Sequence, residues 1–303
     1  MTRLGAVDLS QLPLPDALQI IQFSDIVAEL KSRLLLRFPD AEDVIDDELE
    51  PLVYLTRNFG AREMQLRLGW NDKVRAVLLP TSTGADLDNV GVAYDVARML
   101  VQEADLEASP ARPRIMEDDT RFRRRIQLAP EAFATTGSYE AYLFHTLSAD
   151  IRVLDAGIYN HASYFVHPGQ VRVAVLPIAG ADVVEVTNAV RARLLRKDIK
   201  PLTDDVTVQA AETLPLNVQA VLYTKVGPGA ESVRLAALAR LEAYLVTRRR
   251  VGSIISYSGI MRALHAPGVE TATVLSPVTD VDPGLLGVYV PSTLDISVQV
   301  LNV

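Results

Sequence analysis

The stretch PLVYLTRNFGAREMQLRLGWNDKVRAVLL, residues 51–79, decides the architecture of the first third of the chain. Pro51 suits the first turn of a helix, where its missing N–H costs no hydrogen bond, and the next proline is Pro80. We expect a helix that begins near Asp47 and runs for about 30 residues, or roughly 45 Å, with Gly60 and Gly69 marking a bend or a close contact. Its apolar side chains recur at spacings of three, four or seven residues and are Leu52, Leu55, Phe59, Leu66, Trp70, Val74 and Val77.

A shorter helix is expected just before this one. Ser24 can cap it, Pro39 limits it, and its apolar stripe consists of Ile26, Val27, Leu30 and Leu34. The long helix is more than twice the length of an average globular helix, which has ~11–12 residues. Its apolar stripe is therefore longer than one shorter neighbouring helix can cover. We therefore predict a helical arm that packs against other helices, from this chain or from other chains.

Three more helices are expected before the strands begin. TGADLDN at residues 83–89 predicts a turn that leads into a short helix over 90–103, and residues 107–113 are typical of a linker. Two helices follow within residues 117–149, with a break and a possible cap at Gly137 and Ser138.

From Ile151 onward the hydrophobic period changes to two, which indicates strands. A strand-helix-strand pattern occurs twice at an offset of about 47 residues, which suggests two related units. The first pattern is 171–176, 181–196 and 206–208; the second is 218–223, a turn at Gly227-Pro228-Gly229, 231–249 and 269–275. A last alternating strand covers 295–300.

These patterns predict an elongated multidomain α+β protein. An N-terminal helical bundle arm is followed by two α/β (strand-helix-strand) units with mixed or antiparallel sheets. The predicted domains are the arm at 1–112, a middle α/β domain at 113–214 and a C-terminal α/β domain at 215–303.

The composition is apolar, which indicates either large apolar cores or apolar surface that closes against partners. Hydrophobic residues make up 49% of the 303 residues and charged residues 22%, with a mean hydropathy of +0.16. No apolar run is long enough to span a membrane, and the absence of cysteine excludes disulfides and thiolate metal sites. Residues 1–50 carry 4 basic and 11 acidic side chains, so −7 of the net charge of −8 lies there. Phosphate repulsion then disfavours nucleic-acid binding by this region.

No constellation of residues in the sequence supports a reaction. The four histidines, His145, His161, His167 and His265, form no metal motif, and the acidic run over 40–50 lacks the spacing of a calcium loop. Ser256-Tyr257-Ser258-Gly259 is not a nucleophile elbow. We expect no catalytic residue, no cofactor and no metal.

A basic cluster, Arg121, Arg123, Arg124 and Arg125, is a possible electrostatic interface for the acidic arm of a neighbouring subunit. Two other functions stay open at this point. One is a cytoplasmic enzyme or small-molecule-binding protein with a pocket at the α/β repeat that holds His161 or His167. The other is a nucleic-acid-binding module, which requires this arginine cluster to be exposed.

Several strings are distinctive beyond their periodicity. They are residues 23–39 with the acidic segment after them, NDKVRAVLL at 71–79, TGADLDNV at 83–90, LAPEA at 128–132, GSYEAY at 137–142, HTLSADIRVLD at 145–155 and PGQVRVAVL at 168–176. Together they resemble the baseplate J-like proteins, wedge components of contractile phage tails and R-type bacteriocins. The likeness covers most of residues 20–215, and TGADLDNV is its most specific string. Residues 159–167 depart from the family pattern, in which a plainer and shorter segment is expected before Pro168-Gly169.

The resemblance implies a scaffold protein with no reaction of its own. Two copies would join one tail-protein-I-like subunit in a wedge, with the N-terminal helices in a shared bundle and the C-terminal α/β domains pairing into a ring around the tail hub or spike. A small lysozyme-fold-like baseplate protein would connect this bundle to the sheath, and ring opening on host contact would drive sheath contraction. The implied location is the virion, in the tail baseplate, or an extracellular tail-like particle, after assembly in the bacterial cytoplasm. The resemblance implies neither a nucleic-acid partner nor a membrane span.

Overall fold

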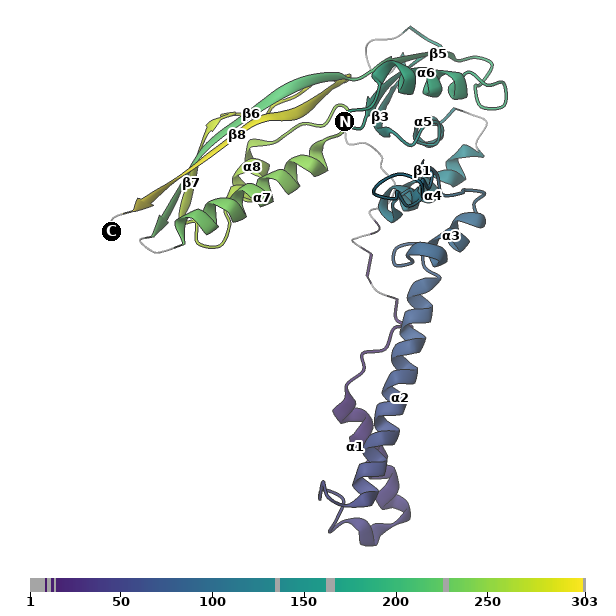
Figure 1. Cartoon of the computed structure of the whole chain (residues 1–303), viewed down its shortest axis with the longest axis vertical. Helices are drawn as coiled ribbons and strands as arrows, with labels where there is room; N and C mark the ends of the chain where they lie inside the picture. The colour runs from purple at the N-terminus through teal and green to yellow at the C-terminus, as the bar shows by residue number, and fades with distance from the viewer. Residues whose placement is uncertain are drawn as a thin grey trace. The chain divides into compact units, whose positions relative to one another are not determined.

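Two helices packed side by side form an arm near the start of the chain (Figure 1). The computed structural model describes Leu9, Leu12, Pro13 and residues 15–133, 137–161, 167–225 and 229–301. Helix α1 spans Phe23–Arg37 and α2 spans Pro51–Ala76. Pro51 lies in the first turn of α2 as predicted, but the helix begins at Pro51 and not near Asp47, since residues 48–50 form a turn. Basic residues in the last turn of α2 offset the helix macrodipole. The predicted cap at Ser24 is wrong, because α1 begins one residue earlier and the Ser24 hydroxyl donates to Asp25 instead.

The next segments complete the first of two units, Met1–Gln127 and Leu128–Val303. They are a one-turn helix η2 at Pro39–Ala41, α3 at Gly84–Val92, strands β1 at Leu100–Gln102 and β2 at Ile115–Met116, and α4 at Asp119–Ala132, which contains the boundary. The predicted division into three domains, with boundaries after residues 112 and 214, stays a prediction.

The helix predicted over residues 90–103 is wrong. Helix α3 occupies the TGADLDN string instead, and residues 100–102 form β1, paired antiparallel with β2. The physical reason is a cap from a distant segment: the Asp119 carboxylate of α4 accepts a hydrogen bond from the Gly84 N–H at 3.1 Å. A free amide at the start of a helix is thereby satisfied by a residue that local sequence cannot reveal.

The second unit contains two mixed sheets. Their strand orders are β3-β4-β5 and β7-β6-β8, and in each sheet one neighbouring pair is antiparallel and the other parallel. Its elements are α5 at Tyr139–Leu147, β3 at Val153–Tyr159, β4 at Gln170–Pro177, α6 at Val183–Leu194, β5 at Asp205–Ala210, β6 at Glu212–Lys225, α7 at Ala230–Arg248, α8 at Tyr257–Leu264, β7 at Thr271–Ser276 and β8 at Gly287–Leu301. The α+β class with mixed sheets is confirmed, and the predicted last strand forms β8.

The internal repeat is only partly confirmed. The first pattern forms β4-α6-β5 with parallel strands, and Asp182 caps α6 by accepting from the Val184 and Glu185 N–H groups. In the second pattern an additional helix, α8, intervenes, and β7 returns antiparallel to β6. A strand-helix-strand pattern does not encode strand direction, so the sequence could not separate the two cases. The predicted turn at Gly227-Pro228 and part of the 159–167 departure, residues 162–166, lie outside the described residues.

Apolar side chains hold the second unit together. Helices α7 and α8 cover one face of the β7-β6-β8 sheet (Figure 1), where Leu222, Leu241 and Ile260 are fully buried. Between the two sheets, the buried Asp155 carboxylate of β3 accepts from the Val251 N–H at 3.1 Å. In the part of the chain that the structure describes, no helix is both long and apolar enough to cross a membrane.

Candidate assembly surface

Helix α2 presents one apolar face to α1 and a second to solvent. The face toward α1 buries Val53, Thr56, Gly60 and Asn71. At Gly60 an added Cβ would lie 3.1 Å from Val27 Cγ2 of α1, a tight contact that confirms the expected close approach of the two helices. At Gly69 an added Cβ would meet nothing within 4 Å.

The second face of α2 carries the stripe predicted from the sequence. Its exposed members and their exposed fractions are Leu55 53%, Phe59 67%, Leu66 59%, Trp70 59% and Val77 71%, whereas Leu52 and Val74 are half-buried. At ~100° per residue this stripe is roughly a quarter turn away from the face that α1 covers. From Leu55 to Val77 it extends ~33 Å at 1.5 Å per residue. An exposed apolar surface of this length is a candidate interaction site, and its part in binding a partner stays a prediction.

The stripe of α1 has a different role. Ile26 is buried, and Val27, Leu30 and Leu34 are half-buried. These residues pack within the arm, as the contacts of Val27 and Leu30 with Gly60 indicate. Their part in binding a partner stays a prediction.

Several large apolar side chains of the arm that the sequence reading did not name are also exposed. They are Ile20, Leu36, Phe38, Tyr54 and Leu68. At ~100° per residue, Tyr54 and Leu68 lie more than a third of a turn from the centre of the predicted stripe, so neither fits the three-four spacing on which that prediction rested.

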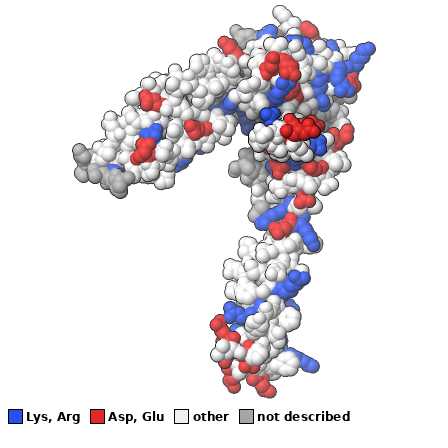
Figure 2. All heavy atoms as spheres, viewed as in Figure 1, with Lys and Arg blue, Asp and Glu red and all other residues white. Residues whose placement is uncertain are grey.

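The connection between α1 and α2 is acidic. Of its carboxylates, Asp46 pairs with Lys31 at 2.6 Å and Glu48 with Arg57 at 2.5 Å. Figure 2 shows acidic side chains gathered at this end of the arm, with basic side chains and uncharged surface along its length. The segment therefore concentrates negative charge at the end of the arm.

The TGADLDNV string is organised by a single arginine. Arg98 Nε donates to Asp88 Oδ1 at 2.7 Å, and Arg98 Nη1 lies 2.8 Å from Asp119 Oδ1. The guanidinium also stacks over the Phe122 ring, 4.6 Å from its centroid. The Gly84 N–H and Arg98 together lower the pKa of Asp119. Arg98 was not singled out from the sequence, because its partners come from two other segments, α3 and α4.

The predicted basic cluster is largely engaged inside its own unit. Arg121 Nε lies 3.0 Å and Arg125 Nη1 2.5 Å from the carboxylate of Glu117, which is buried. Arg123 donates to the carbonyl oxygens of Leu79 and Ser82. Arg125 is only 5% exposed and is a structural residue here. For Arg121, Arg123 and the half-buried Arg124, an electrostatic interface stays a prediction.

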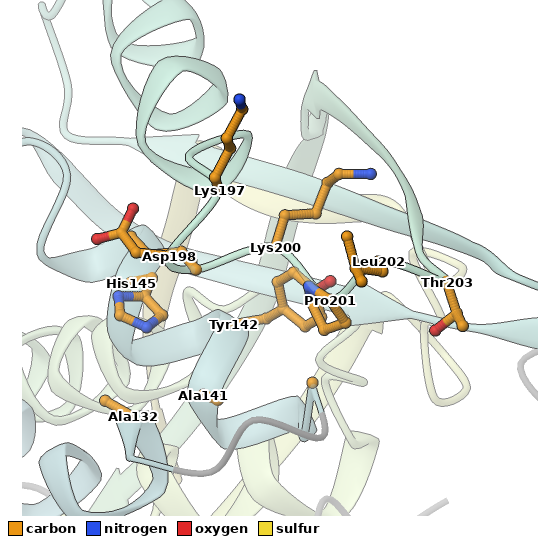
Figure 3. Close-up of a pocket in the computed structure, with 12 residues that line it drawn as sticks. Ala132, Ala141, Tyr142, His145, Lys197, Asp198, Lys200, Pro201, Leu202 and Thr203 are labelled. Carbon is orange, nitrogen blue, oxygen red and sulfur yellow. The ribbon is translucent and has the colours of Figure 1, made fainter.

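A pocket of ≈ 410 Å³ lies in the second unit between α5 and the loop after α6 (Figure 3). Tyr142 and His145 project from α5 toward this loop. The Tyr142 hydroxyl donates to Asp204 Oδ2 at 2.7 Å; burial and this bond raise the pKa of Tyr142. Burial, reinforced by Arg193, lowers the pKa of His145 to about 4. The Tyr142–Asp204 hydrogen bond ties the loop to α5, and His145 lines the pocket beside it, but the two side chains do not form a nucleophile and base pair.

The histidines named in the alternative reading lie elsewhere. The pocket is lined by His145 and not by His161 or His167. Over the described ranges, no group of three or more histidine or acidic side chains is placed to hold a metal ion.

Comparisons with known proteins agree with the architecture of the arm. Residues 48–105, which contain α2 and α3, match the family described as the Baseplate J-like N-terminal domain. The chain is also 36% identical, over 285 residues, to baseplate protein J of Escherichia phage P2, and the match covers 91% of this chain and 92% of that protein. The chain belongs to the baseplate J-like protein family.

Proposed function

We propose that the chain is a structural subunit of a contractile-tail baseplate, and within it a wedge protein. The observation that carries this proposal is the apolar stripe on α2, which α1 of the same chain leaves uncovered. The similarity to baseplate protein J of phage P2 supports the assignment to a baseplate. The chain then works in the virion or in a tail-like particle, after assembly in the bacterial cytoplasm.

The stripe enters a helical bundle with other wedge chains. Its partners are a second copy and a tail-protein-I-like subunit, and a small lysozyme-fold-like protein joins the bundle to the sheath. Burying large side chains such as Phe59 and Trp70 supplies the main driving force, at roughly 25 cal/mol per Å² of apolar surface. The α/β domains form a ring around the tail hub, and a change between two packings of this ring couples host contact to sheath contraction. The chain acts by multivalent packing and catalyses no reaction.

Charge reversal on the stripe tests the proposal. Leu55→Asp and Trp70→Asp place a carboxylate on exposed positions, so the chain itself still folds, but the carboxylate is desolvated in the bundle. Each variant is co-expressed with the neighbouring gene products, and the mass of the complex is measured after purification. Gln65→Asp, exposed on α2 outside the stripe, is the matched control. Loss of the complex for the stripe variants alone supports the proposal; complexes retained by all three overturn it.

A small-molecule-binding function has one observation in its favour, the pocket that contains Tyr142 and His145. The Tyr142 hydroxyl in this pocket is already committed to Asp204 of the loop, so the assembly function is better supported. The nucleic-acid reading required exposed arginines, and Arg125 is buried while Arg121 and Arg123 hold internal partners.

A further inference from the structure

Strand β8 is the margin of the β7-β6-β8 sheet. Over the described residues its one neighbour is β6, with which it pairs in parallel from Gly287 to Leu301. The outer edge of β8 therefore presents backbone N–H and C=O groups that no other strand of the sheet uses. Such an edge is a template for an added strand unless the sequence protects it.

Protection is confined to the first part of β8. Pro291 has no N–H to donate, and the register with β6 shifts there, because Leu216 pairs with Pro291 but Asn217 pairs with Thr293. From Thr293 to Leu301 the register is regular, and Asp295 is the single charged residue. Proline, bulges and charges are the usual devices that block an edge. The second part of β8 has almost none of them.

The other sheet margins are shorter. Strands β5 and β7 have 6 residues each, and β7 is followed directly by Pro277. At ~3.3 Å per residue, the open part of β8 offers ~30 Å of edge. It is the longest regular margin in the sheets of the described chain.

Side chains of the open part of β8 are sorted between the two faces of the sheet. Ile296 is 5% exposed on the face that α7 and α8 cover, with Leu294 and Val298 packed beside it. Val300 is 45% exposed on the same face. Thr293, Asp295, Ser297 and Gln299 alternate with them on the other face.

We propose that the outer edge of β8 pairs antiparallel with β8 of a second copy, about a twofold axis at Ser297. This register places Ile296 opposite Val298 of the second copy and Leu294 opposite Val300, so apolar side chains meet on the covered face. Asp295 faces Gln299 of the second copy, and no like charges are opposed. Two identical strands that pair about a twofold axis must have a sequence that is complementary to itself about that axis. Pairing of β8 with a strand of another protein would place no such requirement on the β8 sequence.

The pairing deepens the proposed function, in which two copies meet, and it rests on that proposal. A strand pair of this length is small beside a standard interface of ~1,600 Å². The α2 stripe therefore has to raise the effective concentration at which two β8 strands meet. The strand pair then sets the orientation of the two α/β units relative to each other.

Single cysteines test the register, because the natural chain has none. In an antiparallel pair, directly opposed Cα atoms are about 4.5 or 5.5 Å apart, and both distances fall within the range of a disulfide. Ser297→Cys in the full chain, co-expressed with the neighbouring gene products and mildly oxidised, should give a disulfide-linked dimer. Thr293→Cys lies on the same strand and face, but in this register two such cysteines are ~27 Å apart.

Several-fold more dimer from Ser297→Cys than from Thr293→Cys is the expected result. Equal linkage of both variants indicates random collision and overturns the pairing, as does linkage of neither. As a second measurement, Ser297→Lys opposes two ammonium groups, so the purified complex should keep its mass but sediment more slowly, as a more extended particle. Thr273→Lys on β7 should leave the sedimentation rate of the complex unchanged, and a Ser297→Lys complex that sediments like it contradicts the pairing. If Leu55→Asp disrupts the complex but Ser297→Cys gives no disulfide-linked dimer, only the strand pairing is wrong. If Ser297→Cys gives the linked dimer but Leu55→Asp leaves the complex intact, the helical bundle is contradicted.

Discussion

Asn71 of α2 exchanges two hydrogen bonds with the backbone of Gln19. The Gln19 N–H donates to Asn71 Oδ1 at 3.1 Å, and Asn71 Nδ2 donates to the Gln19 carbonyl at 2.9 Å. Asn71 is 5% exposed, so both ends of its amide are committed to this contact. The chain before α1 is thereby attached to α2, next to Trp70 of the exposed stripe.

Replacing Asn71 by alanine should release this attachment. Both backbone groups of Gln19 lose their partner, which costs about 1–3 kcal/mol in the free energy of unfolding. Denaturant unfolding measures the loss, and limited proteolysis should detect faster cleavage near Gln19. Asn58→Ala is the matched control, because the Asn58 amide donates only to Tyr54 within α2 and is exposed. Equal effects from both variants would contradict a tethering role.

Periodicity predicted the elements that local sequence determines. Pro51 lies in the first turn of α2 as expected, and Ser138 caps α5 by accepting from the Ala141 N–H at 3.2 Å. The exposed stripe was also found in advance, because three-four spacing places its members on one side of any helix. In each case the signal lies within a few residues of the feature that it predicts.

Features that depend on contacts between distant segments could not be predicted. Helix α3 is capped by Asp119, which lies 35 residues later, and β1 forms where a helix was expected. In the sequence Asn71 looks like an ordinary polar surface residue, because its partner Gln19 lies 52 residues away. Likewise, the arginine cluster resembles a basic surface in sequence, but Glu117 folds into it.

Two helical glycines of the first unit should respond oppositely to alanine. A Cβ at Gly91 would lie 2.7 Å from both Phe122 Cζ and the Val96 carbonyl oxygen, so α3 must shift and the chain loses about 1–3 kcal/mol. At Gly69 the added methyl meets nothing, and the gain in helix propensity is about 0.5–1 kcal/mol. Denaturant unfolding of both variants checks the signs. A stable Gly91→Ala variant would mean that α3 packs differently against α4.

The Glu117 carboxylate should be essential to the first unit. Glu117→Gln removes the charge that Arg121 and Arg125 share and leaves two guanidinium groups in a buried site, which costs about 3–5 kcal/mol. The control is Glu103→Gln, because Glu103 is exposed and lies 4.0 Å from Arg114. Loss of that surface pair should change the free energy of unfolding by less than about 1 kcal/mol. Similar stabilities of the two variants, measured by urea unfolding, would show that the buried cluster contributes little.

His145 should make the second unit sensitive to acid. Its pKa is about 4 in the folded chain, chiefly because of burial and then because of Arg193 and Arg196, with Asp198 acting in the opposite direction. An unfolded histidine has a pKa near ~6.5, so between pH 6.5 and 4 the unfolded chain binds more protons than the folded one. The free energy of unfolding must therefore fall as the pH falls through this window, by at most about 3 kcal/mol from this residue. His145→Asn cannot titrate, so it should lose less stability than the natural chain when urea unfolding at pH 7 and pH 4.5 is compared. His265→Asn, at an exposed position of the same unit, controls for the general effect of replacing a histidine. If His145→Asn keeps the full pH dependence, acid sensitivity of this unit arises from its carboxylates and not from the pocket beside α5.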